Sequence, residues 1–170
     1  MKAVKRLILA VVFGLALASS AQAKDMKFGY VDLSRVFDNY QKTKESDAVL
    51  QKDSQAFAQE RDKMIAKVRD AQGKLALLKE SEKQKMQADI DKQKADLIEF
   101  DKQKRTALAK QRDDKVREIL LEIEKTVSEM AKKEGYDLIF NDRVLVYGDP
   151  GMNLTEKVLK AVNDAYPGKK

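Results

Sequence analysis

The chain has 170 residues, a formal net charge of +6 and 36% charged residues. It contains no cysteine and no histidine, which excludes disulfide bridges, thiolate metal ligands and histidine acid–base catalysis. Because a glycine-rich phosphate loop is also missing, the sequence predicts neither an enzyme nor a bound cofactor.

The first 23 residues have the three parts of a secretory signal peptide. MKAVKR is basic, Leu7 to Ala18 is apolar, and Ala21-Gln22-Ala23 is a small-residue cleavage site. The apolar run is too short for a transmembrane helix, which needs about 20 residues. We expect export and cleavage after Ala23, and loss of the basic start lowers the net charge from +6 to +3.

A short strand and a short helix are expected next. Lys27 to Val31 reads as the strand, and a helix follows Asp32. Its apolar face consists of Leu33, Val36, Phe37 and Tyr40. We assign residues 24–40 to a small body that also includes residues 135–170.

Residues 41–134 are predicted to form a helical hairpin arm. The segment contains one glycine and no proline, and it is rich in residues that lose little side-chain entropy in a helix. Ser81-Glu82-Lys83-Gln84 fits a capping box, which predicts that the second helix starts there. Apolar residues of the first helix recur every seven positions, as in a coiled coil: Leu50, Phe57, Met64, Ala71 and Leu78.

The second helix has two apolar sets at steps of four and three, and they are out of phase by two residues. Packing between them is expected to be weak and bendable. Gly135 can adopt the left-handed conformation that ends a helix. The sets are Met86, Ile90, Gln93, Leu97 and Phe100, and then Val116, Leu120, Ile123, Val127 and Met130; an eleven-residue spacing joins Met86, Leu97, Leu108, Ile119 and Met130.

The C-terminal part of the body is predicted to hold two strands and a helix. Tyr136 to Phe140 and Val144 to Tyr147 read as strands joined by a turn near Asn141. An amphipathic helix follows a cap at Asn153 to Glu156. Its apolar residues are Leu154, Val158, Ala161, Val162 and Ala165.

A body of this size cannot bury enough apolar surface to stand alone, and an open strand edge invites aggregation. Oligomerisation removes both problems, and three copies of a three-stranded unit would make a closed or nearly closed sheet. We therefore expect the chain to be an oligomer. The candidate interface residues are Phe28, Tyr30, Leu138, Phe140, Val144 and Val146.

Both ends of the mature chain resemble the Skp/OmpH family of periplasmic chaperones. The similarity is densest in GYVDLSRVFDNYQKTK and in GYDLIFNDRVLVYGDPGMNLTEKVLKAVN. The resemblance implies an α+β, mostly α fold, in which a long antiparallel coiled-coil hairpin projects from a small β-barrel body formed by a homotrimer. It also implies the periplasm of a Gram-negative bacterium and ATP-independent holding of unfolded outer-membrane β-barrel proteins between the arms. The tip, KESEKQK, lacks the glycine often expected in a helix-to-helix turn, so the resemblance leaves its conformation open.

The arms carry the excess basic charge, which would attract an acidic unfolded client. An anionic membrane surface is a further partner that these charges suit, whereas interleaved acids and export argue against nucleic acid. A structural envelope spacer is the alternative function. Each apolar candidate can instead pack in the seam between the helices. The candidate client-binding residues are Arg61, Lys63, Lys67, Leu77, Leu78, Met86, Phe100, Lys102, Lys104, Arg105, Leu108 and Arg112.

Overall fold

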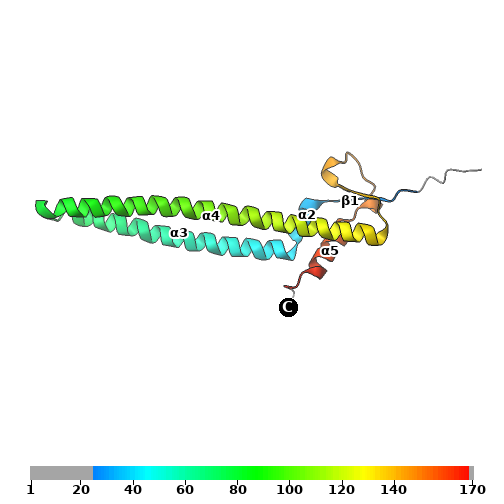
Figure 1. Ribbon diagram of the computed structural model, residues 1–170, viewed down its shortest axis with the longest axis horizontal. Helices are drawn as coiled ribbons and strands as arrows, with labels where there is room; N and C mark the ends of the chain where they lie inside the picture. The colour runs from blue at the N-terminus through cyan, green and yellow to red at the C-terminus, as the bar shows by residue number, and fades with distance from the viewer. Residues whose placement is uncertain (1–24, 169–170) are drawn as a thin grey trace, which may run out of the picture.

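The computed structural model describes residues 25–168, which form a long helical hairpin joined to a small body (Figure 1). The predicted signal peptide and its cleavage site lie outside these residues. The elements are β1 (Phe28–Val31), α2 (Leu33–Asn39), α3 (Gln41–Leu75), α4 (Glu80–Glu134), β2 (Leu138–Asn141), the 3₁₀ turns η1 (Asp142–Val144) and η2 (Pro150–Met152), and α5 (Thr155–Ala165).

The arm consists of α3 and α4 lying side by side along most of their length (Figure 1). At 1.5 Å per residue, the 55 residues of α4 extend about 80 Å. The predicted seam is confirmed, because each residue of the seven-residue and eleven-residue series is buried or half-buried. No helix among the described residues is long and apolar enough to cross a bilayer.

Side chains of the seam are fully buried near its two ends but not in its middle, where the phase mismatch predicts weak packing. In α3 no residue between Thr43 and Val68 is fully buried. In α4 the same holds between Ile90 and Ile119. Half-buried apolar contacts alternate there with polar pairs, which include a hydrogen bond of 3.0 Å from the Gln111 amide nitrogen to the Asp53 carboxylate.

The predicted capping box at Ser81 is wrong. Helix α4 begins at Glu80 behind Lys79, and no side chain caps it. The Lys79 carbonyl accepts hydrogen bonds from the amides of Glu82 and Lys83 at 2.9 and 3.2 Å. Since Ser81 already lies inside the first turn, its hydroxyl is not at the position that serves a cap. The chain turns without glycine through residues 76–79.

The other end of α4 follows the prediction. Gly135 adopts φ 74° and ψ 32°, and its amide donates to the Ala131 carbonyl. Lys132 and Lys133 lie in the last turn, where positive charge favours the helix dipole. This left-handed turn redirects the chain into β2.

The body is built where the two ends of the chain meet. Strands β1 and β2 are parallel, so the whole arm serves as the connection between them. Below the sheet, α2 and α5 pack with the root of α4. The Thr155 hydroxyl accepts the Asp32 amide at 2.9 Å, and the Asn163 side chain accepts the Gln41 amide at 2.8 Å. The buried core contains Val31, Val36, Tyr40, Ile119, Ile123, Met130, Leu154, Val158 and Val162.

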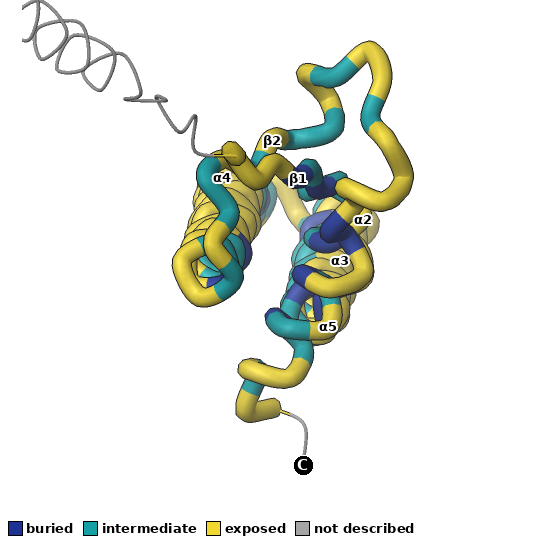
Figure 2. The backbone as a smooth tube through the Cα atoms, turned by 90° about the vertical axis from the view of Figure 1, so that its right-hand side faces the viewer, coloured by how far each residue is buried: buried dark blue, intermediate teal, exposed yellow. Residues whose placement is uncertain are grey.

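The predicted third strand at Val144 to Tyr147 is wrong. The chain turns at η1 instead, and the Leu145 amide donates to the Asp142 carbonyl at 2.9 Å. One edge of β1 pairs with β2, and the other is taken by a bridge from Tyr30 to Asn153. Residues 142–149 form a loop, most of which is exposed in Figure 2.

Candidate functional site

One face of the two-stranded sheet is apolar and open. Phe28 lies opposite Leu138, and Tyr30 lies opposite Phe140, so these predicted interface residues share a face. The exposed fractions of Phe28, Leu138 and Phe140 are 39%, 47% and 39%. The ring centroids of Phe28 and Phe140 are 6.4 Å apart. Val31 points the other way and joins the core.

The open sheet face continues into a groove beside the root of α4. The groove has a volume of about 310 Å³ and is lined by Leu138 and Phe140 from β2 and by Val127 and Ala131 from α4. Tyr136 also lines it. An apolar face with an adjoining groove is typical of a surface that contacts another chain.

The loop after β2 exposes the remaining candidate interface residues. Val144 is 70% exposed and Val146 is fully exposed. Tyr147, which was not among the candidates, is 80% exposed beside them. Arg143 donates to the Ser34 hydroxyl at the start of this loop. The loop thus adds exposed apolar side chains to the same end of the molecule.

Several candidate client-binding residues lie between the arm helices. The Arg61 guanidinium is 3.0 Å from the Asp101 carboxylate, and the Phe100 ring lies 5.7 Å from the Phe57 ring. The Arg105 guanidinium binds the same Asp101 at 2.6 Å. Half-buried positions along the seam are taken by Leu78, Met86 and Leu108.

The other candidates are exposed. Leu77 is 86% exposed at the tip. The Lys104 ammonium lies 5.7 Å from the centre of the Phe100 ring. The remaining exposed basic candidates are Lys63, Lys67, Lys102 and Arg112.

Sequence reasoning missed one set of exposed apolar residues on α4. Ile98 is 70% exposed, and it was not among the candidates. Val116 and Leu120 are 36% and 37% exposed, although their spacing placed them in the seam with Ile123. That assignment is wrong because Ile119 and Ile123 take the inward positions. The two-residue phase mismatch was the signal that a second face exists.

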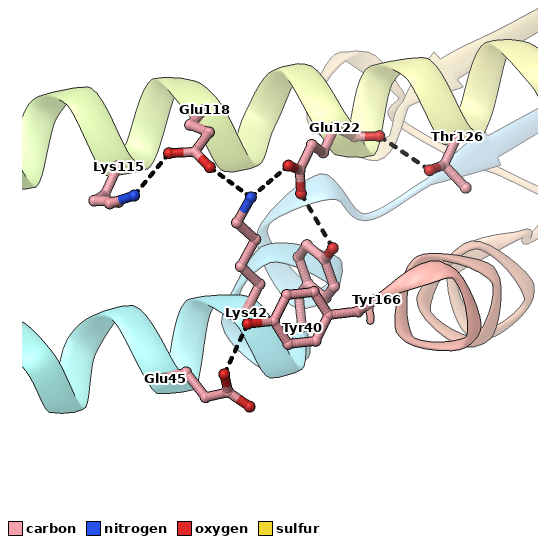
Figure 3. A network of polar contacts seen from close by, with 8 residues as sticks. All are labelled: Tyr40, Lys42, Glu45, Lys115, Glu118, Glu122, Thr126 and Tyr166. Carbon is pink, nitrogen blue, oxygen red and sulfur yellow. Dashed lines mark hydrogen bonds and ion pairs between the residues drawn. The ribbon is translucent and has the colours of Figure 1, made fainter. Parts of the chain in front are cut away.

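A polar network holds the arm at its root (Figure 3). Lys42 of α3 binds two carboxylates of α4, at 2.6 Å for Glu118 and at shorter range for Glu122. The Tyr40 hydroxyl donates to Glu122 at 3.2 Å. Behind it, the Tyr166 hydroxyl donates to Glu45 of α3 at 2.7 Å. The network links α3, α4 and the end of α5.

Two pKa values report the strength of this network. Hydrogen bonds from Lys42 and then Lys115 lower the pKa of Glu118 to about 2. Burial, followed by the charge of Glu122, raises the pKa of Tyr40 to about 12. These groups keep their charge states at neutral pH, so the network holds α3, α4 and the end of α5 together under those conditions. Among residues 25–168, no three acidic side chains gather in a way that could hold a metal ion.

Comparison with known proteins identifies the family. The family model described as outer membrane protein (OmpH-like) matches residues 27–162, which include the arm and nearly all of the body. The chain belongs to this OmpH-like family.

Relatives of this OmpH-like chain carry the name chaperone protein Skp. The protein of Vibrio cholerae is 29% identical over 170 residues, covering 93% of this chain and 99% of its own. That of Yersinia enterocolitica is 29% identical over 171 residues with the same coverage. That of Photorhabdus luminescens is 30% identical over 173 residues, again covering 93% and 99%.

A solved structure supports the OmpH-like fold. The crystal structure of a putative outer membrane chaperone (OmpH-like) from Caulobacter crescentus has a TM-score of 0.77. It covers 83% of this chain and 86% of its own, at 10% sequence identity. At that identity the likeness concerns the fold alone.

Proposed function

We propose that the protein is a periplasmic holdase chaperone that binds unfolded outer-membrane β-barrel proteins without ATP. The observation that carries this proposal is the membership in the OmpH-like family together with relatives named chaperone protein Skp. The predicted signal peptide, with cleavage after Ala23, supports the periplasm as its location.

The open sheet face supports a working form with several copies. Phe28, Leu138 and Phe140 are exposed at the root of the arm, and the groove beside them is apolar. Burying this surface against a second copy would extend the small core of the body. The family resemblance supports a trimer for this assembly, with three arms around a shared space.

The exposed surface of the arm is suited to binding an unfolded client, which has no fixed structure. This surface is mixed: Leu77 and Ile98 are apolar, and Lys102 and Arg112 are basic. An unfolded β-barrel offers many weak apolar contacts and an acidic net charge. Long-range attraction followed by many weak contacts holds such a client without tight local fit.

Light scattering tests the proposal. A urea-unfolded outer-membrane β-barrel protein is diluted into buffer with the mature protein and without nucleotide. We expect aggregation to be suppressed near one oligomer per client, and an unrelated coiled-coil protein at equal mass serves as the control. Unchanged aggregation would contradict the holdase proposal and favour an envelope spacer.

A further inference from the structure

Helix α4 carries a second stripe besides the seam. Its members recur at steps of four and three, which places them on one side of a helix, and all of them are exposed. We name this surface the α4 stripe. It consists of Ile98, Lys102, Arg105, Ala109, Arg112, Val116 and Leu120.

Except at Arg105, whose guanidinium lies 5.9 Å from the centre of the Phe57 ring of α3, the α4 stripe is separate from the face that packs on α3. Val116 and Leu120 each lie one residue away from a seam residue, Lys115 and Ile119, which corresponds to a rotation of about 100° around the helix. Seven residues beyond Leu120, Val127 lines the groove at the root. The stripe therefore leads along the arm toward the open sheet face.

We propose that the α4 stripe is the surface of the arm that contacts the unfolded client. This inference rests on the proposed holdase function and specifies where the client binds. The partner is an extended chain with apolar residues and a net negative charge. Its apolar side chains would lie on Ile98, Val116 and Leu120, and its acids would pair with Lys102 and Arg112.

The charges favour a client over a second copy of this chain as the occupant of the stripe. Arg105 is balanced by Asp101, whereas Lys102 and Arg112 form no ion pair within residues 25–168. Asp101 and Asp113 are the acids next to them in sequence. If two copies paired stripe against stripe, these cations would meet their own copies. Repulsion between like charges disfavours that contact. An acidic client would instead pair with these cations.

Two exposed alanines provide a matched crosslinking test. Ala109 lies on the stripe, and Ala107 lies two residues away, about 200° around the helix. Each is replaced by the photo-crosslinking residue benzoylphenylalanine in the full mature protein, and an unfolded acidic outer-membrane β-barrel protein is the probe. We expect the variant at Ala109 to give about fivefold more client adduct than the variant at Ala107.

Three outcomes of that experiment would overturn the inference. They are equal adducts at both positions, adducts mainly between copies of this chain at position 109, and no client adduct at either position. Adducts are quantified only in samples where light scattering shows that the variant still suppresses aggregation of the client. If the proposed holdase function is wrong, the unmodified protein does not suppress aggregation. That result is distinct from the three outcomes above, which show that the stripe is not the contact surface.

A charge-reversal pair tests the polar part of the stripe. The variant K102E/R112E changes the stripe, and K92E/K110E makes the same change in net charge on another exposed side of α4. In stopped-flow capture of the acidic client at low salt, we expect the first variant to be about fivefold slower than the second. Equal rates would mean that net charge alone attracts the client, and the proposed stripe contact would be wrong.

Discussion

Phe140 is the residue on which the proposed assembly depends most directly. Its side chain is 39% exposed, lies on the open sheet face with Phe28, and lines the groove beside α4. An aromatic side chain in this position loses much of its contact with water only when another surface covers it.

The first prediction concerns the variant Phe140→Asp. A charge on the open sheet face would have to be buried without a partner in the oligomer, so we expect the native mass in sedimentation to fall toward that of one chain. Leu121→Asp is the control, because Leu121 is 59% exposed on α4 and lines neither the sheet face nor its groove. An unchanged mass for Phe140→Asp would contradict the assembly model.

The second prediction concerns Glu118 in the root network. Its folded pKa of about 2 lies below its ordinary value of 4.5, so the folded state binds this proton more weakly than the unfolded state. Its contribution to stability is complete above pH 4.5 and is lost as the pH falls toward 2. Urea unfolding of Glu118→Gln should therefore show a smaller loss of stability between these pH values than the original protein.

Glu124→Gln is the control for that measurement. Glu124 is exposed on α4 and takes no part in the root network drawn in Figure 3. We expect this variant to lose stability with acid as the original protein does. If Glu118→Gln behaves in the same way, the hydrogen bonds from Lys42 and Lys115 do not carry the stabilisation assigned to them.

Among the elements, the arm divides into two firm ends and a softer middle. The ends are held by apolar residues such as Ile90 and Ile119, whereas polar groups such as Arg61 and Asp101 meet in the middle. Polar pairs that are partly exposed contribute little net stability, so this zone should open more easily than the ends.

The third prediction is therefore a pattern of hydrogen exchange along the arm. Backbone amides near Asp101 should exchange faster than those near Ile119, and Asp101→Asn should accelerate the middle further, by about threefold. Asp91→Asn is a control on the same helix, because Asp91 bonds only within α4. Uniform protection along α4 would show that the polar contacts pack as firmly as the apolar ones.

The elements also show which features can be predicted from sequence. The seam and the Gly135 cap depend on neighbours along one helix, and local periodicity predicts them. The segment from Val144 to Tyr147 has strand propensity, but the 3₁₀ turn η1 follows β2 directly and the segment does not pair with the sheet. Val116 and Leu120 were misplaced because helical spacing alone does not say which neighbour a face contacts.

For the whole molecule, the central claim is that several copies join through the body and hold one unfolded client between their arms. The body offers the apolar sheet face for assembly, and the arm offers about 80 Å of mixed surface for binding. On this proposal, assembly and binding use different parts of the chain.

Native mass spectrometry of the mature protein with an unfolded outer-membrane β-barrel protein tests that claim most directly. We expect one dominant complex whose mass equals three copies of this chain plus one client. A client bound to single chains, or an oligomer with no client at concentrations where aggregation would otherwise occur, would contradict the claim.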